Sequence, residues 1–509
     1  MTSTSYITTP IYYVNDRPHI GHAYTSLAAD VLARWRRLQG REVFFLTGTD
    51  EHGQKVEKAA ADAGMDPQAF TDQVSQHFRD LTATMGLSND AFIRTTEERH
   101  KQTCQALWEK LAANGEIYLG HYEGWYAVRD EAFYGPDELV ERDGVKHAPS
   151  GAPVEWVREP SYFFRLSAWQ DRLLAYYEAN PDFILPASRR NEVMAFVKSG
   201  LGDLSISRTS FTWGVKVPGD PAHVMYVWLD ALANYITAAG WPHDPEAFAK
   251  WWPAELHFVG KDIVRFHAIY WPAFLMGAGL PVQHRVFAHG WWTNEGQKIS
   301  KSIGNVIDPV ALVEEFGLDA VRYFLLREVP FGQDGDFSRS ALVNRLNGEL
   351  ANALGNLANR TLSLIQRNCA ATLPASADRA PGDVALRTLV DALPATVGAH
   401  LDRQEYHLAL EAVMALAREA NGYITVEAPW ALKKTDPVRM EAVLRHLHDT
   451  LRALATVLQP FMPDTMAKLL DQLGVPQEAR GLDHLSTPLP AGLPLPPPEP
   501  LFKKVETAA

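Results

Sequence analysis

The chain has 509 residues, of which 46% are hydrophobic and 21% charged, and its formal net charge is −13. Roughly 100–200 residues per domain would give three or four domains. No run of about 18 apolar residues occurs, and the first residues resemble no signal peptide, so we expect a cytoplasmic location and no membrane partner. Only Cys104 and Cys369 are present, which excludes a disulfide framework and a cysteine-based metal site. The acidic charge argues against a DNA-coating protein but permits a local RNA-binding track.

The N-terminal stretch predicts a strand, a tight turn and a helix. Residues 6–13 are β-branched and aromatic, and apolar residues recur at helical spacing after Gly21. Pro18 suits the first turn of a helix, and His19 and His22 share one face near the positive end of its dipole. Two imidazoles there could hold nucleotide phosphates. The four residues His19 to His22 alone fit a helix start with two surface histidines equally well.

The next segments alternate between strand and helix patterns. Residues 41–50 read as a buried parallel strand that ends at Gly48, with Asp50 at its exit, and residues 66–118 read as helical. This rhythm predicts a doubly wound, Rossmann-like parallel sheet, whose ligands lie at the carboxyl ends of the strands. From Gly120 the pattern changes to short aromatic strands and turns, which indicates an insertion. Further strands of the sheet are predicted at 224–230, 256–262 and 285–290.

Long amphipathic helices dominate the chain after Phe331, which predicts a C-terminal α-helical bundle. The helices are expected at 339–369, 384–398, 405–426, 437–458 and 463–473. The fold class is therefore α/β, a doubly wound sheet interrupted by an insertion and followed by the bundle. The expected divisions are a first half of the nucleotide-binding domain at 1–118, the connective insertion at 119–223, the second half at 224–296, a linking segment at 297–338 and the helical domain at 339–509.

A polar loop, Lys-Ile-Ser-Lys-Ser at 298–302, lies between Gly296 and Gly304. Its ammonium groups could close over a triphosphate and stabilise oxygens that gain negative charge during phosphoryl-type transfer. Taken alone, such a loop is more often a solvated surface turn. Combined with the histidine turn on a doubly wound fold, it favours nucleotide chemistry.

His-Ile-Gly-His near the N-terminus and Lys-Ile-Ser-Lys-Ser far downstream are the two signatures of class I aminoacyl-tRNA synthetases, and the whole chain resembles the methionyl-tRNA synthetase family. Supporting motifs occur in order at 13, 49–53, 227–231, 260–267, 288–290, 356–360 and 428–430. The resemblance implies an ATP-dependent ligase. Such an enzyme activates L-methionine to methionyl-adenylate and transfers the methionyl group to the 3′ end of tRNA(Met), the initiator included.

The resemblance also implies roles for the residues of the two signatures. His19 and His22 would hold phosphates, while Lys298 and Lys301 would stabilise the pentavalent phosphorus and the leaving pyrophosphate. Magnesium would accompany the triphosphate. Further contacts to ATP are expected from Gly21, Gly260, Asp262, His289, Trp292 and Ser300. Arg208 matches a family arginine in the active-site region, although a structural ion pair is an equally good interpretation.

Methionine needs a carboxylate for its ammonium group and a soft, dry cavity for its thioether. Asp50 matches the family's acid. Contacts to the thioether sulfur from Tyr13 or His267 would help discrimination, because one methylene is worth only about 1–3 kcal/mol. The family's pocket wall matches Ile11, Tyr13, Trp228, Ala231, Tyr235, Ile263 and His267. Without the resemblance, this aromatic stripe would be assigned to the core.

For tRNA, the resemblance implies anticodon contacts from Asn356, Arg360 and Trp430. Asn356 and Arg360 are four apart on one helix face, and Trp430, the one tryptophan of the bundle, suits stacking on an unpaired base. Without the family, Trp430 is better explained as a plug of the bundle core.

Many relatives carry a zinc knuckle in the insertion, but here the ligand positions hold Ala127, Asp130, His147 and Ser150. Tetrahedral zinc needs four good ligands, so no zinc is expected. The insertion would instead hold its shape by packing of Trp125, Tyr126, Phe133 and Tyr134. The chain also ends soon after the bundle, without the dimerising module of some relatives, so a monomer is expected.

Other functions fit parts of the sequence. Another class I synthetase for a hydrophobic amino acid would usually carry a larger editing insertion than the roughly 100 residues here. A non-catalytic tRNA- or mRNA-binding protein would have no use for both signatures. A nucleotidyltransferase with a His-x-Gly-His turn would not explain the anticodon set.

Overall fold

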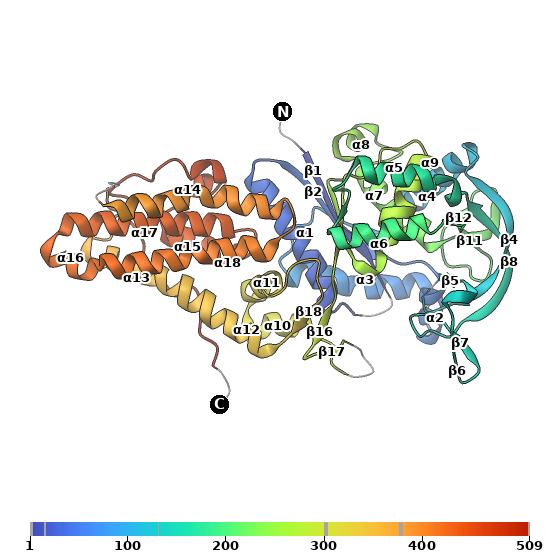
Figure 1. The fold of residues 1–509 in the computed structure, drawn as a ribbon, viewed down its shortest axis with the longest axis horizontal. Helices are drawn as coiled ribbons and strands as arrows, with labels where there is room; N and C mark the ends of the chain where they lie inside the picture. Colours follow the sequence, from blue (N-terminus) through green and yellow to red (C-terminus); the bar gives the residue numbers. More distant parts are fainter. Residues whose placement is uncertain (1–3, 15–16, 131, 300–303, 376–379, 507–509) are drawn as a thin grey trace.

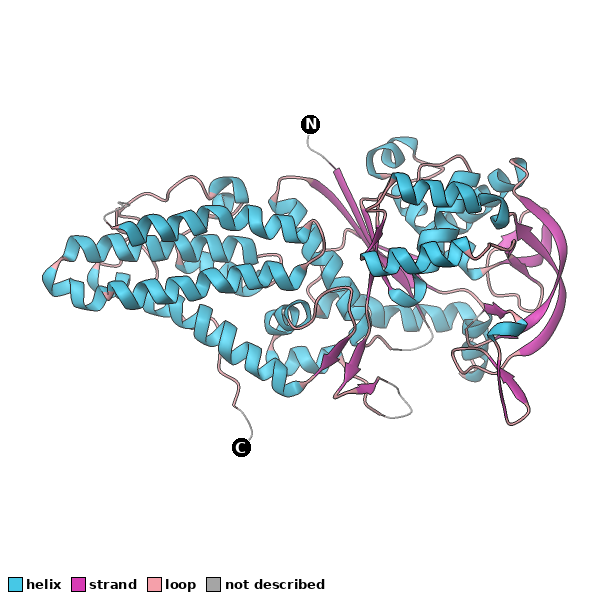
Figure 2. Ribbon diagram, viewed as in Figure 1, coloured by secondary structure: helices cyan, strands magenta, loops and turns pink. Residues whose placement is uncertain are grey.

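The computed structural model describes residues 4–14, 17–130, 132–299, 304–375 and 380–506 (Figures 1 and 2). Ser300 and Lys301 therefore lie outside the described residues. The bundle forms one end of the elongated molecule, the sheet lies in the middle and the insertion forms the other end (Figure 1). Within the described ranges, no helix combines the length and the apolar character needed to cross a membrane.

In the described part of the chain, six strands form one parallel sheet in the order β3-β2-β1-β14-β15-β9. The order reverses between β1 and β14, which is the position where doubly wound sheets bind ligands. The predicted doubly wound sheet is thus confirmed. The N-terminal half supplies β1 (Thr4–Tyr13), α1 (Ile20–Leu38), β2 (Glu42–Asp50), α2 (Gln54–Asp62), α3 (Pro67–Thr84), β3 (Ala91–Arg94) and α4 (Glu98–Ala113). The later half supplies α7 (Val227–Ala239), α8 (Pro245–Trp251), β14 (Leu256–Gly260), α9 (Trp271–Gly277) and β15 (Val286–His289).

The prediction of a core strand at 224–230 is wrong. Residues up to Met225 belong to an antiparallel strand in a separate sheet, and α7 begins at Val227. The run is apolar throughout because the start of α7 is buried on nearly every side, so it lacks the periodicity that separates a helix from a buried strand. The short strand β3 was also hidden within the stretch 66–118, which was predicted to be helical.

The segment expected as the insertion is built on a long antiparallel pair, β4 with β8 (Figure 2). It is not wholly separate from the core, because β9 within it pairs with β15 at the edge of the parallel sheet. Two apolar residues carry no period, so the sequence could not reveal this strand. The elements are β4 (Ile117–Ala127), β5 (Ala132–Tyr134), β6 (Val140–Arg142), β7 (Val145–His147), β8 (Glu155–Phe164), α5 (Gln170–Ala179), β9 (Ile184–Leu185), α6 (Ala187–Lys198), β10 (Leu204–Ser205), β11 (Ser207–Arg208), β12 (Lys216–Val217) and β13 (Asp220–Met225).

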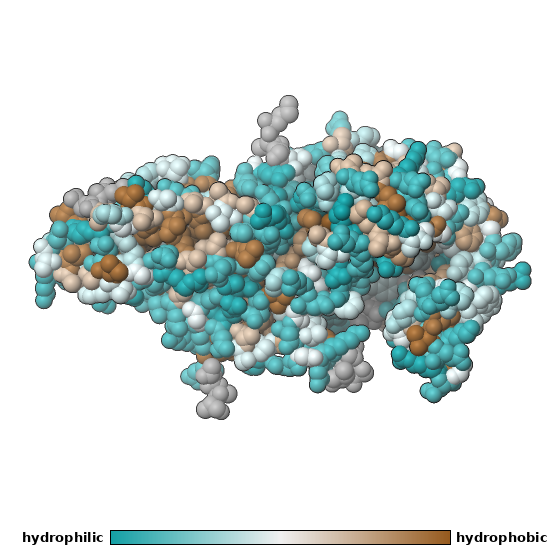
Figure 3. Space-filling view, in the orientation of Figure 1, coloured by the Kyte–Doolittle hydropathy of each residue, from teal (hydrophilic) through white to brown (hydrophobic). Residues whose placement is uncertain are grey.

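A linking segment and the helical bundle complete the chain. The linking segment contains β16 (Trp292–Asn294), β17 (Gln297–Lys298), α10 (Pro309–Phe316), α11 (Leu318–Arg327) and β18 (Gly335–Phe337). The bundle contains α12 (Arg339–Arg345), a π-helical stretch (Leu346–Gly355), α13 (Asn356–Asn368), α14 (Pro381–Leu401), α15 (Tyr406–Glu427), α16 (Pro429–Thr435), α17 (Pro437–Leu458) and α18 (Pro463–Gln472). Their polar faces point outward, so the visible surface is largely hydrophilic with scattered apolar patches (Figure 3).

The bundle packs directly on the helix that follows the histidine turn. Arg322 of α11 is fully buried and donates to the carboxylate of Asp30 on α1 (2.7 Å) and to the carbonyls of Pro460 (2.7 Å) and Phe461 (3.0 Å). The hydroxyl of Tyr406 on α15 donates to the carbonyl of Ala28 on α1 (2.7 Å). A buried pair of this kind is costly to break, so these contacts fix α1 against the bundle.

Candidate active site

A cavity of about 500 Å³ opens at the carboxyl edge of the parallel sheet. The last residues of four strands line it: Tyr13 of β1, Asp50 of β2, Gly260 of β14 and His289 of β15. Parallel strands end at one edge, which is why residues far apart in sequence meet here. The cavity brings together the following predicted residues: His19, His22, Gly21, Gly260, Asp262, His289, Ile11, Tyr13, Asp50, Trp228, Ala231, Tyr235, Ile263 and His267.

The histidine turn begins α1 and presents both imidazoles to this cavity. His19 is the N-cap residue, and its Nδ1 accepts a hydrogen bond from the backbone N–H of Gly21 (3.1 Å). The Nδ1 of His22 accepts from the backbone N–H of His19 (3.0 Å). Because both Nδ1 atoms act as acceptors, the neutral rings carry their proton on Nε2. Each ring can therefore donate an Nε2–H to a phosphate oxygen.

Burial keeps both rings neutral. It lowers the pKa of His19 and lowers the pKa of His22 well below its usual value, with the neighbouring His19 adding to the effect at His22. The rings therefore act as directional hydrogen-bond donors at neutral pH. Gly21 permits this arrangement, because a Cβ there would lie 2.9 Å from Cε1 of His19 and displace that ring.

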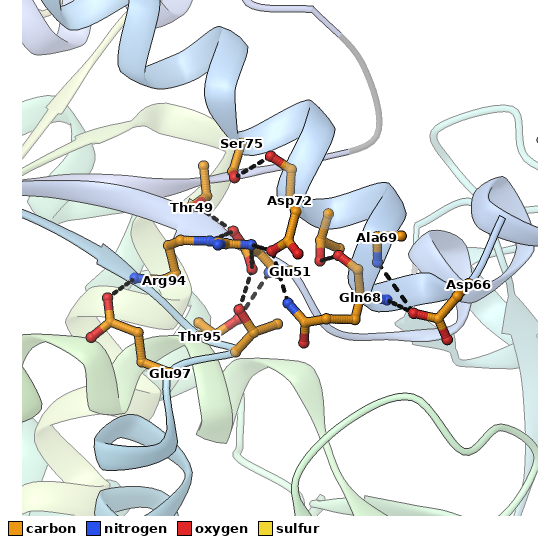
Figure 4. Close-up of polar contacts among 12 residues, drawn as sticks. Thr49, Glu51, Asp66, Gln68, Ala69, Asp72, Ser75, Arg94, Thr95 and Glu97 are labelled. Carbon is orange, nitrogen blue, oxygen red and sulfur yellow. Dashed lines mark hydrogen bonds and ion pairs between the residues drawn. The ribbon is translucent and has the colours of Figure 1, made fainter.

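Asp50 at the end of β2 is 7% exposed. Its position is fixed through the next residue, Glu51. The buried carboxylate of Glu51 accepts from both Nε (2.7 Å) and Nη2 (3.0 Å) of Arg94 on β3, and from the hydroxyl of Thr49 (2.8 Å). Arg94 also pairs with Asp72 of α3, so it lies between two carboxylates (Figure 4). This network fixes the strand end from which Asp50 faces the cavity.

Aromatic side chains form the apolar part of the cavity. Trp228 of α7 stacks on Phe266, with ring centroids 3.7 Å apart and planes 9° apart. His267 lies on a π-helical turn (Phe266–Tyr270), where its Nδ1–H donates to the carbonyl of Ile263 (3.0 Å) and its Nε2 accepts from the hydroxyl of Tyr235 (2.7 Å). Both ring nitrogens of His267 are thus engaged within the wall. To contact a thioether sulfur, His267 would have to give up one of these two hydrogen bonds.

His267 makes the stability of the fold depend on pH. Burial lowers the pKa of His267 to about 4, whereas an imidazole in an unfolded chain titrates near 6.5. The unfolded state therefore binds the proton more readily, and the stability contributed by this group is lost as the pH falls from about 6.5 towards 4. Between pH 7 and pH 5 the loss is about 2 kcal/mol. Urea titrations at these two pH values measure the free energy of unfolding. Between pH 7 and pH 5, His267→Gln should lose about 2 kcal/mol less of this free energy than the wild type. An unchanged pH dependence would contradict this.

Gly260, Asp262 and His289 line another part of the cavity. A Cβ on Gly260 would lie 2.4 Å from a carboxylate oxygen of Asp262, so a larger residue there would displace the Asp262 side chain. Nε2 of His289 lies 2.6 Å from the hydroxyl of Thr25, and its Nδ1–H donates to the carbonyl of Gly290 (2.8 Å). Burial lowers the pKa of His289. These groups present backbone and small polar atoms suited to a ribose and a base.

The cavity is bordered by Trp291 rather than by Trp292. Trp292 is 7% exposed and packs edge-to-face on Tyr24 in the core, whereas Trp291 is 47% exposed and its indole N–H donates to Asp262 (3.2 Å). Nothing in the sequence distinguishes the two adjacent tryptophans. Other cavity residues that the sequence analysis missed include Thr25 of α1, Lys55 of α2 and Arg129 of the turn after β4, which come from three separate segments.

The described part of the lysine loop adjoins the histidine turn. Lys298 on β17 is exposed and lines a second cavity of about 900 Å³, which also borders His19, Gly21 and Trp292. His19 and Gly21 line both cavities, so the cavity that Lys298 lines adjoins the one that holds the aromatic pocket. A triphosphate could extend from one cavity into the other past His19.

The residues expected at the anticodon lie on two helices of the bundle, α13 and α16, which contact each other, and α16 lies at the end of the bundle away from the sheet (Figure 1). Trp430 on α16 is 46% exposed, so it does not plug the core. The guanidinium of Arg360 on α13 lies over its ring, 5.4 Å from the centroid. Asn356 is exposed one turn earlier on α13. The three side chains present a stacking face with polar neighbours.

Ala127, one of the four positions that match the zinc ligands of relatives, lies in an apolar cluster. Ala127 is fully buried and packs with Ala148, Ala152 and Val154 against Trp125, Tyr134 and Leu139. The carboxylate of Asp130 accepts from the hydroxyls of Tyr134 (2.9 Å) and Ser150. These side chains do not fit a zinc site, because one ligand position is an alanine and Asp130 is committed to hydroxyls.

Arg208 is 3% exposed and lies among the rings of Tyr226, Phe133 and Tyr126, at 4.7–5.9 Å from their centroids. Its Nη1 donates to the Ser205 hydroxyl (2.8 Å) and to the carbonyl of Ser207 (2.7 Å). Cation–π contacts and backbone acceptors therefore hold the guanidinium. Arg208 thus joins the insertion to Tyr226, the residue before α7.

Comparisons with known proteins agree over nearly the whole chain. Residues 5–362 match the family model of class I tRNA synthetases (M), and residues 373–509 match that of the anticodon binding domain of methionyl tRNA ligase. Methionine--tRNA ligases from Rickettsia bellii and Mesorhizobium japonicum are 60% and 56% identical, over 96% and 98% of this chain and 96% and 97% of theirs. Methionyl-tRNA synthetase of Mycobacterium tuberculosis in complex with methionyl-adenylate superimposes with a TM-score of 0.97 at 50% identity, covering 98% of this chain and all of that one. The chain therefore belongs to the methionyl-tRNA synthetase family of class I tRNA synthetases.

Proposed function

We propose that this chain activates L-methionine with ATP to methionyl-adenylate and transfers the methionyl group to the 3′ end of tRNA(Met), the initiator included. One observation carries the proposal: a single cavity is bordered by the two neutral imidazoles of the histidine turn and by Asp50 with an aromatic pocket. The first set suits a nucleotide, and the second suits an amino acid with a soft apolar side chain. Their common cavity allows the two substrates to react.

The first step needs alignment and charge rather than a protein nucleophile. The carboxylate of methionine attacks the α-phosphorus of ATP, the bond from phosphorus to the bridging oxygen breaks, and pyrophosphate leaves with that electron pair. We assign Asp50 to the ammonium group of methionine. His19 and His22 donate Nε2–H bonds to phosphate oxygens, and Lys298 with Lys301 supplies positive charge to the leaving group.

In the second step, a ribose hydroxyl of the terminal adenosine of tRNA attacks the carbonyl carbon of the adenylate. The ester bond forms, AMP leaves, and the hydroxyl proton passes to solvent or to the departing phosphate. The remaining ATP contacts are assigned to Gly21, Gly260, Asp262, His289 and Ser300. Trp292 stays a proposed nucleotide contact, because it lines the second cavity beside His19 and Lys298, and Trp291 is added because it borders the first cavity.

Magnesium fits as a partner of the triphosphate. In the described ranges, His100, Cys104 and Asp230 form the group of side chains close enough to share an ion, and they are buried outside the cavity wall. The wall near the histidine turn offers imidazoles instead of a carboxylate cage. When bound, the ion would neutralise charge on the β- and γ-phosphates. No zinc is proposed.

Asn356, Arg360 and Trp430 are proposed to bind the anticodon. Trp430→Ala should lower kcat/KM for tRNA(Met) roughly tenfold to a hundredfold, because stacking of a base on an aromatic ring is worth about 1–3 kcal/mol. ATP–pyrophosphate exchange should not change, since Trp430 lies far from the cavity. Steady-state charging kinetics measure the first value.

Val426→Ala is the matched control for Trp430→Ala. Val426 is 81% exposed near the end of α15, so its loss should change charging little. Equal effects of the two substitutions, or an unchanged kcat/KM in Trp430→Ala, would remove the stacking role.

We further propose the boundaries 1–118, 119–223, 224–296, 297–338 and 339–509 as working divisions of the chain. We also propose that the enzyme is a monomer, acts in the cytoplasm and binds no DNA.

ATP–pyrophosphate exchange, driven separately by methionine, leucine, isoleucine and cysteine, tests the proposed activity. Methionine should give rapid exchange, and the others should be slower by at least about tenfold, as expected for side chains that differ by a few atoms. Charging of tRNA(Met) with the same enzyme then tests the second step. Exchange driven best by another amino acid, or by none, would overturn the proposal.

A further inference from the structure

A buried carboxylate outside the cavity wall joins two helices and the loop after β2 in the catalytic domain. Asp230, in the first turn of α7, accepts from Nδ1 of His52 through Oδ2 (2.7 Å) and from Nε2 of His100 on α4 through Oδ1 (2.7 Å). The three side chains are at most 3% exposed. The two imidazoles lower the pKa of Asp230 against the effect of burial, so the carboxylate is ionised and acts only as an acceptor.

This carboxylate connects the two parts of the proposed methionine site. His52 lies two residues after Asp50, the residue assigned to the ammonium group. Asp230 is on the same helix as Trp228, Ala231 and Tyr235, which line the apolar part of the cavity. The two parts come from segments separated in the chain by the insertion, so no local backbone geometry sets their spacing. The bond from His52 to Asp230 crosses this separation.

Asp230, His52 and His100 do not line the cavity, so they do not contact a substrate bound there. A cation site is the alternative use, since ligand atoms of His100, Cys104 and Asp230 lie within 4.8 Å of one another. However, Nε2 of His100 already donates to Asp230, and Nδ1 of His100 lies 3.1 Å from the Thr237 hydroxyl. Burial and Asp230 also raise the pKa of the Cys104 thiol, which opposes the thiolate that a metal needs.

We infer that Asp230 is a positioning residue that holds Asp50 and the aromatic pocket at the spacing required by methionine. The inference rests on the proposed function, because it assigns Asp50 and the pocket to the two ends of one amino acid. A bound methionine must reach both at once, and small displacements of such groups lower the rate steeply. The ATP side of the cavity, formed by the histidine turn and β14, does not depend on this link.

Asp230→Asn tests the inference through the separate KM values for methionine and ATP. The amide of asparagine has one acceptor oxygen and no charge, so it binds the two imidazoles less firmly than the carboxylate does and holds the spacing less well. In ATP–pyrophosphate exchange, KM for methionine should rise roughly 10- to 100-fold, while KM for ATP stays within about twofold.

A rescue pair, His52→Ala and His52→Asn, provides an independent readout. His52→Ala should raise KM for methionine. His52→Asn places an amide N–H near the position of Nδ1, so its KM for methionine should be close to that of the wild type.

Cys104→Ala is the matched control. Cys104 lies in the same buried cluster, 3.2 Å from Nε2 of His100, but it links no second element to Asp50. The Cys104→Ala substitution should lower thermal stability without changing KM for methionine. Unchanged KM for methionine in Asp230→Asn and His52→Ala, or equal rises for methionine and ATP, would overturn the inference. Absence of methionine-dependent exchange in the wild type would instead overturn the proposed function.

Discussion

Asp50→Ala is expected to reduce methionine-dependent ATP–pyrophosphate exchange by about 10²–10³ in kcat/KM while leaving the affinity for tRNA nearly unchanged. Asp50 lies at a strand end, is 7% exposed and faces the same cavity as the aromatic wall. Removing it leaves a desolvated ammonium group without its counter-charge, which costs about 2–5 kcal/mol. The anticodon residues lie on the distant bundle and keep their contacts with tRNA.

Exchange kinetics and tRNA binding measured on the same preparation separate the two effects. Asp50→Asn keeps the shape of the side chain and removes only the charge, so it should lose most of the same activity. Asp62→Ala, at the exposed end of α2, is the matched control and should behave like the wild type. Unimpaired exchange in Asp50→Ala would remove the ammonium-binding role.

His22→Asn is expected to lower kcat of exchange by about 10²–10³, the effect of losing one donor that stabilises charge in the transition state. Asparagine keeps an acceptor near the position of Nδ1, so the backbone N–H of His19 retains its partner and α1 still begins correctly. It lacks a donor at the position of Nε2. His22→Gln places an amide N–H near that position and should retain more activity.

Pre-steady-state formation of the adenylate, with methionine and ATP saturating, measures this effect on the chemical step. Methionine affinity should be the same in both variants, because His22 is assigned to phosphate. If asparagine and glutamine gave equal rates, the Nε2–H would not be the group that acts. If either variant lost methionine affinity, His22 would instead belong to the amino-acid part of the site.

The sequence predicts the helical bundle well, because amphipathic helices with a polar outer face have a clear period. The predicted helix at 437–458 coincides with α17 (Pro437–Leu458), and that at 405–426 differs from α15 (Tyr406–Glu427) by one residue at each end. The short helix α16 escaped prediction because seven residues are too few to show a period. It nevertheless carries Trp430.

The core of the α/β domain is harder to read, for a physical reason. Buried elements are apolar on every side, so residues 224–230 fit a strand as well as the helix that α7 forms there. β3 and β9 are four and two residues long, and only pairing with neighbours makes them strands. Such elements depend on tertiary contacts that the local sequence does not contain.

Most of the site follows from motifs at strand ends, but its finer arrangement does not. The sequence indicates that His19, Asp50 and Asp262 share one edge of a sheet. It does not indicate that the Nδ1 atoms of the histidine turn accept backbone N–H groups, or that Trp291 rather than Trp292 borders the cavity. It includes Asp230 in a motif but does not indicate that this carboxylate binds His52 and His100. These features depend on side-chain directions that only the folded chain defines.

The central claim is that the histidine turn and the lysine loop act on one ATP beside one methionine. A crystal structure of the enzyme with methionine and a non-hydrolysable ATP analogue tests it most directly. We predict the ammonium group at Asp50, the phosphates within hydrogen-bond distance of Nε2 of His19 and His22, and Lys298 on the pyrophosphate side of His19. A nucleotide bound elsewhere, with both imidazoles free of phosphate, would contradict it.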